Sequence, residues 1–378
     1  MFKTRLFSPG PTPVPEETML ALARPMFHHR TPEYCQLLEQ LTGDMKYILQ
    51  TAQDVFTFTG SGTAGMEAAV ANVVARGEKM IAVRGGKFGE RWGEIGKAFG
   101  AQVVNVDIEW GTAITAAQVA DLLKKHPDAA GVFIQQCETS TATAFDVEAI
   151  AKAVAPTPAL LVVDGISSIG AVPFRMDAWG VDVAVVGSQK ALMMPTGLAF
   201  IACSPKAWKK IEATAAPLYY NNVKAFKKSL AKWDNPWTPA NAMVRAAVVS
   251  TGMIRKEGIE KVWADVHRKA EATRAAARAL GLAIFSKSPS DAVTAVLAPP
   301  GVDGEKLYDV LADDFGARAA GGQEKLKGKI IRFSHMGYLD AFDILASVAA
   351  LEMALGKLGH KVAYGAGVAA AQQVLAKA

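Results

Sequence analysis

Short apolar runs alternate with longer amphipathic segments between residues 54 and 204. The apolar runs are rich in Val, Ile, Phe and Ala, and they cover 54–60, 79–86, 101–108, 129–137, 159–165, 181–189 and 197–204. Runs of this length and composition are typical of buried strands, and the segments between them have helical patterning. Strands that alternate with helices form a mainly parallel sheet covered on both faces. The pattern therefore predicts a seven-stranded, doubly wound α/β unit.

Helical patterns flank this unit on both sides. We expect helices over 15–29 and 31–50, because a Pro-Glu and a Thr-Pro pair open them. After the sheet, 241–280 predicts one long helix that leads to a smaller α+β part with strands at 294–299 and 329–335 and a terminal helix after Gly359. The predicted parts are an N-terminal segment 1–17, a large domain 18–255 and a small domain 256–378.

The segment 217–239 differs from its surroundings. It is aromatic and polar, and it shows few core-like periodicities. We expect it to be an excursion on the surface or at an interface between subunits.

Composition places the chain among globular proteins. Of its 378 residues 51% are hydrophobic, so a large core can form. Lys plus Arg number 41 against 36 Asp plus Glu, without a basic run, which argues against a nucleic-acid partner. No apolar run reaches the roughly 18 residues of a membrane span, and the proline-rich start lacks a signal-peptide pattern. We expect a soluble cytoplasmic protein with no membrane partner.

The few cysteines also agree with the reducing environment of the cytoplasm. Cys35, Cys137 and Cys203 are widely separated, with no C-x-x-C pair and no histidine close by. Neither a disulfide framework nor a metal site is expected from this spacing.

The stretch FTFTGSGTAG, residues 56–65, joins a predicted strand to a predicted helix. Gly60, Gly62 and Gly65 have the G-x-G-x-x-G spacing of a dinucleotide-binding loop. Such a loop offers backbone N–H groups, hydroxyls and a helix dipole to a phosphate. The spacing thus indicates a phosphate site without saying which cofactor carries the phosphate.

Two charged residues follow buried strands, where ligand groups gather in a doubly wound sheet. Asp164 lies at the end of one strand, and a buried carboxylate needs a cation or a donor. Lys190 follows another, and desolvation lowers the pKa of a lysine, as an imine-forming amine requires. Taken alone, Asp164 could be a helix cap or a partner in a structural salt bridge, and Lys190 could be a surface lysine. Together they match the carboxylate and the Schiff-base lysine that pyridoxal phosphate needs.

A nicotinamide cofactor is the alternative use of the glycine loop. A dinucleotide fold places an acid about 20 residues after the glycines, where it binds the ribose hydroxyls. Here the next predicted strand contains Arg84 and no acid, although Arg84 suits the 2′-phosphate of NADP. The residues favour pyridoxal phosphate and leave an NADP-dependent oxidoreductase open.

Longer motifs occur in order along nearly the whole chain. They are SPGPTPVP, HHRTPEY, GSGTAGMEA, GKFGERW, ETSTAT, VDGISSIGAVPFRMDAWGVDVAVVGSQKAL and IIRFSHMG. These motifs resemble the class V aminotransferases, and most of all their alanine–glyoxylate and serine–glyoxylate (serine–pyruvate) branch. The resemblance implies the PLP-dependent transferase fold type I. It also implies pyridoxal 5′-phosphate bound in the large domain, residues 1–17 near the active site and the small domain, and a homodimer with shared active sites.

The resemblance also implies roles for individual residues. Lys190 would carry the Schiff base and move the substrate proton, while Asp164 pairs with the pyridine nitrogen. Arg332 would bind the substrate carboxylate through its guanidinium fork. The other implied contacts are Ser61, Gly62, Thr63 and Gln189 at the phosphate, Phe88, Ser140 and Ile166 at the ring, Gly10 at the substrate and, from the partner subunit, a residue of the segment Asn235–Thr238, with Thr238 the chosen candidate.

The implied reaction moves an amino group from alanine or serine to glyoxylate or pyruvate. Aspartate, ureidoglycine or a phosphonate donor stays open, and a second anion could be bound by His28, His29 and Arg30. A cysteine desulfurase is disfavoured, because it needs a nucleophilic cysteine in the small-domain half and none follows Cys203. A catalytically silent relative is disfavoured because the lysine, the aspartate and the arginine are all present.

Overall fold

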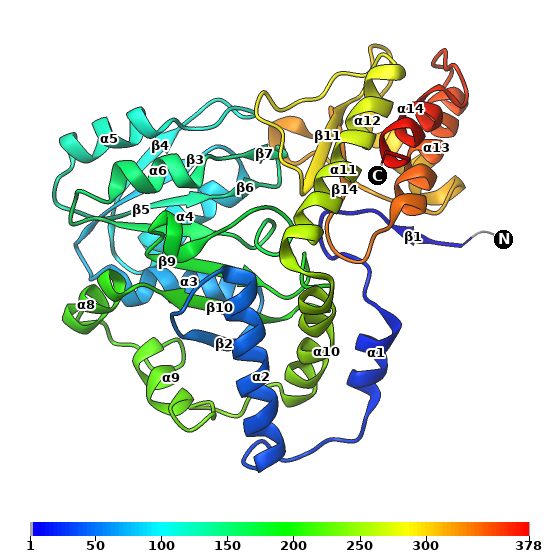
Figure 1. Cartoon of the computed structure of the whole chain (residues 1–378). Coiled ribbons are helices and arrows are strands. Elements are labelled where there is room, and N and C mark those ends of the chain that lie inside the picture. Colours follow the sequence, from blue (N-terminus) through cyan, green and yellow to red (C-terminus); the bar gives the residue numbers. More distant parts are fainter. Residues whose placement is uncertain (1–2, 378) are drawn as a thin grey trace.

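A seven-stranded sheet forms the centre of the larger part of the protein (Figure 1). The computed structural model describes residues 3–377. The strands lie in the spatial order β2 (Val55–Gly60), β10 (Gly197–Cys203), β9 (Val183–Gly187), β8 (Leu160–Asp164), β5 (Ala129–Gln135), β3 (Lys79–Arg84) and β4 (Gln102–Asp107). β10 runs antiparallel to both of its neighbours, and the other pairs are parallel. The predicted mainly parallel sheet of seven strands is confirmed.

Helices between the strands cover the sheet. β8 and β9 are buried at every position, as continuous apolar runs in a doubly wound sheet require. α3 packs against β9 and β10, and α4 packs against β3 and β4. The connecting helices are α3 (Gly62–Val73), α4 (Lys87–Ala98), α5 (Ala116–Lys125), α6 (Val147–Val154), α7 (Met176–Trp179) and α8 (Pro205–Ala213), with a short hairpin of β6 (Cys137–Glu138) and β7 (Thr143–Ala144) before α6.

The smaller part has its own sheet, in the order β11–β14–β13, and its own hydrophobic core. Its elements are α11 (Ile259–Ala279), β11 (Val293–Leu297), α12 (Gly304–Asp309), a π-helical turn Val310–Asp314, β12 (Ala317–Arg318), β13 (Ala320–Gly321), a 3-10 turn Glu324–Leu326, β14 (Ile330–Ser334), α13 (Ala341–Lys357) and α14 (Ala366–Leu375). The predicted strands at 294–299 and 329–335 and the terminal helix are confirmed.

The N-terminal segment joins the smaller part before the chain enters the larger one. Its strand β1 (Arg5–Leu6) pairs in parallel with β12, and Phe7 is buried in the core of the smaller part. Farther along this segment, Thr12 donates its N–H to the Gln189 carbonyl in the turn after β9. This path brings the first residues of the chain to the end of β9.

Two predicted helices differ from the structure. α1 (Glu16–Ala23) ends well before residue 29, because Pro25 disfavours the helical conformation for the residue before it. The single helix predicted over 241–280 is wrong: Gly258, with a φ of 94°, separates α10 (Asn241–Glu257) from α11. A positive φ suits glycine because it has no Cβ. α2 (Pro32–Leu49) agrees with its prediction.

The segment 217–239 is docked more firmly than its sequence predicts. It contains the helix α9 (Val223–Leu230), and the Phe226 ring lies 4.0 Å, centroid to centroid, from the ring of Phe58 on β2. The expectation of a surface excursion is wrong for α9, whose Phe226 is buried, and the expected interface stays a prediction. Tyr219 and Tyr220 beside it are exposed.

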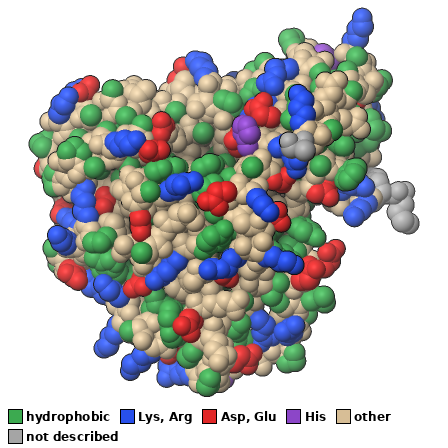
Figure 2. Space-filling model, in the orientation of Figure 1, with side chains coloured by type: hydrophobic (Ala, Val, Ile, Leu, Met, Phe, Trp, Pro, Cys, Tyr) green, Lys and Arg blue, Asp and Glu red, His purple; other side chains and the backbone are tan. Residues whose placement is uncertain are grey.

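The domain boundaries at 17 and 255 stay a prediction. One hydrophobic cluster collects side chains from Ala21 to Trp263, and a second collects Phe7 with side chains from Ala277 to Leu355. Lys, Arg, Asp and Glu side chains are interspersed on the face shown in Figure 2. Between residues 3 and 377, no helix combines the length and the apolar character needed to cross a membrane.

We expect Phe226→Ala to lower the free energy of unfolding by about 3 kcal/mol, because the substitution removes a packed core ring. Phe226 is 5% exposed, whereas Phe342 is 78% exposed. Phe342→Ala is therefore the matched control and should change stability by no more than about 0.5 kcal/mol. Urea unfolding followed by circular dichroism measures both. Equal effects of the two substitutions would show that α9 is not docked.

Candidate active site

The strand ends of the large sheet form a small cavity of about 80 Å³. Asp164 ends β8, Lys190 follows the neighbouring β9, and the glycine loop follows β2. The residues that line it are Ser61, Gly62, Thr63, Phe88, Arg91, Asp164, Ile166, Ser167, Gln189 and Lys190. Eight of these were predicted from the sequence; Arg91 and Ser167 were not.

The glycine loop presents the start of α3 to this cavity. Ser61 is the N-cap residue, and Gly62 and Thr63 are the first two residues of the helix. Their N–H groups have no partner inside the helix, so they can bind an anion. A Cβ on Gly62 would lie 2.5 Å from Ile166 Cδ1, so the close approach of these two segments needs glycine.

Asp164 is a buried carboxylate. Its Oδ1 accepts a hydrogen bond of 2.8 Å from the Ile166 N–H. Burial raises the pKa of Asp164 to about 7, although this hydrogen bond and the charges of Arg91 and Lys190 oppose the rise. A cationic or N–H partner in the cavity would return the carboxyl group to its ionised form.

Lys190 reaches the cavity from the turn after β9. Its Nζ donates a hydrogen bond of 2.7 Å to the Pro9 carbonyl, and Thr12 Oγ1 donates one of 2.8 Å to the Lys190 carbonyl. Burial lowers the pKa of Lys190 to about 8, while the charge of Asp164 opposes this shift. The N-terminal segment thus holds the lysine in place, and burial makes its amine easier to deprotonate.

Gly10 touches the same lysine. It has a φ of 138°, and a Cβ at this position would overlap Nζ, Cε and Cδ of Lys190. The predicted closeness of Gly10 to the reactive centre therefore has a physical basis: only a residue without a side chain leaves room for Lys190.

Ser140 lies behind the cavity wall, where it meets a buried carboxylate that was not predicted from the sequence. The Ser140 hydroxyl donates to Glu138 Oε1 at 2.5 Å, and it accepts the Lys87 N–H. Glu138 also accepts the N–H groups of Phe88 and Gly89, at 3.4 Å and 2.8 Å. Glu138 and Ser140 thereby cap the N-terminus of α4 and fix the backbone that carries the Phe88 ring. Glu138 is the first residue of the ETSTAT motif, just after the end of β5, and this position is the one sequence signal that could have indicated it.

Arg332 lies on the central strand of the small sheet and faces the larger part. It donates to the Gly321 carbonyl at 3.1 Å and 2.8 Å and to the Thr139 carbonyl at 2.9 Å. Burial lowers its pKa to about 10, which the charge of Glu138 opposes. Among residues 3–377, no carboxylate lies within 4.0 Å of this guanidinium, so it is available for an anionic ligand.

Some candidate residues lie elsewhere. Thr238 is exposed, and Asn235 in the same segment donates to the Thr57 carbonyl on β2. The His28 and His29 rings stack on each other before α2 and do not line the cavity. Arg84 donates to both carboxylate oxygens of Asp107, at 2.8 Å and 2.6 Å, so it is already occupied by an acid of its own chain.

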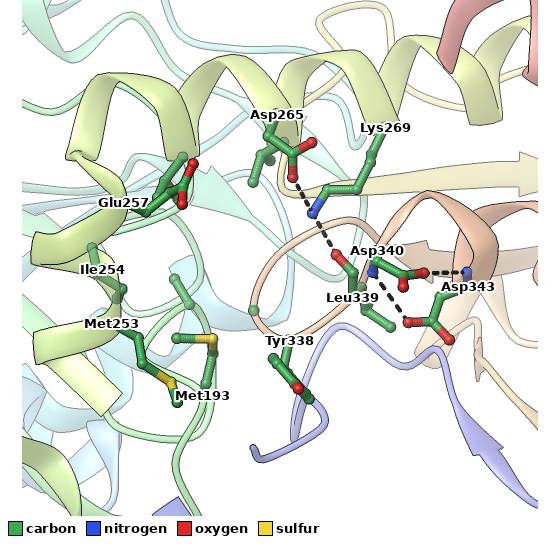
Figure 3. Close-up of a pocket in the computed structure, with 14 residues that line it drawn as sticks. Met193, Met253, Ile254, Glu257, Asp265, Lys269, Tyr338, Leu339, Asp340 and Asp343 are labelled. Atoms are coloured by element: carbon green, nitrogen blue, oxygen red, sulfur yellow. Dashed lines mark hydrogen bonds and ion pairs between the residues drawn. The ribbon is translucent and has the colours of Figure 1, made fainter. Parts of the chain in front are cut away.

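A larger cavity of about 440 Å³ lies between α10, α11 and the loop before α13 (Figure 3). Lys269 is its buried cation. Its Nζ is bound by Asp265 Oδ2 at 2.8 Å and by the Leu339 carbonyl at 2.6 Å. Because this amine is already paired with a carboxylate, the smaller cavity at the strand ends is the candidate active site.

Residues 6–342 match the family described as aminotransferase class-V. The chain belongs to this family. The aminotransferase is 36% identical to the serine–glyoxylate aminotransferase of Methylorubrum extorquens (99% of this chain, 96% of the relative). It is also 36% identical to the L-aspartate–glyoxylate aminotransferase of Paracoccus denitrificans (97% and 95%), and 39% identical to the soluble hydrogenase 42 kDa subunit of Anabaena cylindrica (98% of each).

The aminotransferase also superimposes on solved structures of the family. The ureidoglycine–glyoxylate aminotransferase of Bacillus subtilis gives a TM-score of 0.94 at 27% identity and covers 100% of this chain and 99% of that one. The family membership removes the nicotinamide alternative, so the enzyme is a PLP-dependent transaminase. The predicted class and cofactor are confirmed.

The cavity fits pyridoxal 5′-phosphate. Among the described residues, only one Asp164 oxygen accepts a hydrogen bond. The Gln189 side-chain amide lines the cavity with its Oε1 buried and unpartnered, and the same amide can turn its N–H donors toward an anion. The unpaired N–H groups at the start of α3 suit the phosphate, and the Asp164 carboxylate suits the protonated ring nitrogen. These unmatched groups are the complement of this cofactor.

Covalent attachment of added cofactor to Lys190 should accelerate as the pH rises through about 8, because only the neutral amine attacks an aldehyde. The neutral fraction grows above the pKa, so the rate rises with pH and levels off beyond it. Stopped-flow absorbance of the cofactor measures this rate. A midpoint at the ordinary lysine value of 10.5 would show that Lys190 is not desolvated.

Gly10→Ala should slow this attachment by at least about tenfold, because the new Cβ displaces the Lys190 amine by the roughly 1 Å that costs such a factor or more. Gly77→Ala is the control: Gly77 also has a positive φ, 83°, but no atom lies within 4 Å of the place that its Cβ would take. Both variants carry the same kind of backbone strain. Equal rates for the two variants would refute the steric role of Gly10.

Proposed function

We propose that this aminotransferase moves an amino group from alanine or serine to glyoxylate or pyruvate. The carrying observation is the set of cations around the cavity. Lys190 and Arg91 line it. Arg332 is a buried guanidinium on the small sheet, and its charge lies near enough to Lys190 to contribute to the lowered pKa of that amine. A donor with one carboxylate uses Arg332 alone, whereas aspartate would need a second cation for its side chain. Arg91 donates to Thr63 at the start of α3, on the phosphate side of the cavity, so we do not assign it to the donor. The serine–glyoxylate relative supports this assignment, and the aspartate–glyoxylate relative names the principal alternative.

The proposed roles follow the contacts. Arg332 binds the substrate carboxylate by two parallel hydrogen bonds. Asp164 holds a proton on the ring nitrogen, and the bound cofactor then supplies an electron-withdrawing ring that stabilises charge at the substrate α-carbon. The free amine of Lys190 has a lowered pKa, so it can take the α-proton of the substrate near neutral pH and then return it. The Pro9 carbonyl gives its Nζ a fixed acceptor between these transfers.

The remaining cofactor contacts are proposals of the same kind. Ser61, Gly62, Thr63 and Gln189 bind the phosphate. Phe88 and Ile166 hold the two faces of the ring, and Ser140 positions Phe88 through the start of α4. Gly10 leaves space beside Lys190 for the substrate.

A homodimer with shared active sites completes this proposal. Met19, Leu20 and Met26 expose large apolar side chains on and after α1, as an unpaired interface does. Thr238 is exposed beside the edge strand β2, and we propose that it reaches the phosphate in the partner subunit. The three free cysteines agree with a cytoplasmic protein.

A single half-reaction tests the donor. Alanine or serine should convert the bound cofactor to its amine form, seen as loss of the visible band, faster than aspartate does. Arg332→Met should weaken the apparent affinity for the donor by about 100-fold, since a charged bidentate pair is lost, and Arg332→Lys by less.

The control for this experiment is cofactor binding itself, which neither Arg332 variant should change. Faster conversion by aspartate would contradict alanine or serine as the donor and leave the assignment as a transaminase unchanged. An unaltered donor affinity in Arg332→Met would overturn the role of Arg332.

A further inference from the structure

Arg91 is a cation of the cofactor cavity to which the sequence assigned no role. It lies on α4 one turn after Phe88, with its guanidinium carbon 5.0 Å from the centre of the Phe88 ring. Its Nη1 donates a hydrogen bond of 3.1 Å to Thr63 Oγ1. The stacking and this bond hold the guanidinium across the cavity against the first turn of α3.

Arg91 has no acid of its own. Within residues 3–377, no carboxylate oxygen lies within 4.0 Å of it. Arg84, which precedes the same helix, shows the usual arrangement with both oxygens of Asp107. A guanidinium that lines a half-buried cavity without a counter-ion is stabilised when an anion binds there.

Three anions could meet Arg91: Asp164, the substrate carboxylate and the cofactor phosphate. The Asp164 carboxylate is near enough for its pKa to be lowered by Arg91, but burial is the larger influence and no ion pair forms. For the substrate carboxylate we have proposed Arg332, on β14 of the small sheet. Thr63, which Arg91 touches, belongs instead to the helix start whose free N–H groups suit a phosphate.

We propose that Arg91 is a further cofactor-binding residue, which pairs with the phosphate ester of pyridoxal phosphate beside Ser61, Gly62 and Thr63. The phosphate brings about two negative charges. The backbone N–H groups supply no full charge, so a guanidinium in contact with Thr63 provides the counter-ion. The Phe88 ring, which is expected to meet the cofactor ring, keeps Arg91 in place.

The test compares two ligands that differ only in the phosphate. Apoprotein is titrated with pyridoxal phosphate and with pyridoxal, and binding is followed by absorbance and by quenching of tryptophan fluorescence. Arg91→Met should weaken the affinity for pyridoxal phosphate by about 10- to 100-fold and change the affinity for pyridoxal by less than about twofold. The reason is that a charged hydrogen bond is lost only with the first ligand. Arg91→Lys should recover part of the loss.

Arg84→Met is the matched control, because it removes an arginine that is paired outside the cavity, and it should leave both affinities unchanged. Equal losses for the two ligands in Arg91→Met would overturn the proposal and place Arg91 at the ring or in folding. Unchanged affinities would overturn it as well.

A second measurement does not depend on the folding of Arg91→Met. Inorganic phosphate should compete with pyridoxal phosphate for the wild-type apoprotein and less well for Arg91→Lys; equal competition would count against the proposal. Failure of the wild type to bind pyridoxal phosphate at all would instead refute the cofactor assignment, so the two failures are distinguishable.

Discussion

Removal of Asp164 and Lys190 from water is the constraint on which the site depends. The two groups lie at the ends of neighbouring parallel strands of the large sheet, where Asp164 is buried and Lys190 is largely shielded from water. Burial disfavours the charged form of each group, so the pKa of the acid rises to about 7 and that of the amine falls to about 8. Each shift suits the role that we propose for the group: Asp164 as the acid beside a cationic ring nitrogen, and Lys190 as a nucleophile and base near neutral pH.

Segments from distant parts of the chain hold the surroundings of Asp164 and Lys190 in place. The N-terminal segment crosses from the small sheet to the end of β9, and its Pro9 carbonyl and Thr12 hydroxyl hold Lys190. Arg332 reaches from the small sheet to the Thr139 carbonyl of the larger part. Lys190 and Arg332 are thereby held by contacts between segments that lie more than a hundred residues apart in the sequence.

Much of this arrangement could be predicted from the sequence, and the remainder depends on contacts between distant segments. Asp164, Lys190 and the glycine loop are local signals, because each follows an apolar strand. Glu138 and Arg91 carry no such local signal. Glu138 matters through its contact with the start of α4, and Arg91 through its contact with Thr63; both contacts form only in the packed fold. The break at Gly258 was missed because helical periodicity continues through it, and α9 because Phe226 packs on a strand far away in the chain.

The most direct test of this mechanism locates the covalent bond to the cofactor. The protein is incubated with pyridoxal phosphate, the adduct is reduced with borohydride, and the peptides are mapped by mass spectrometry. We expect one reduced pyridoxyl group per chain, on Lys190, and its loss in Lys190→Ala. A label on another lysine, such as the paired Lys269 of the larger cavity, or an unlabelled protein would contradict the assignment.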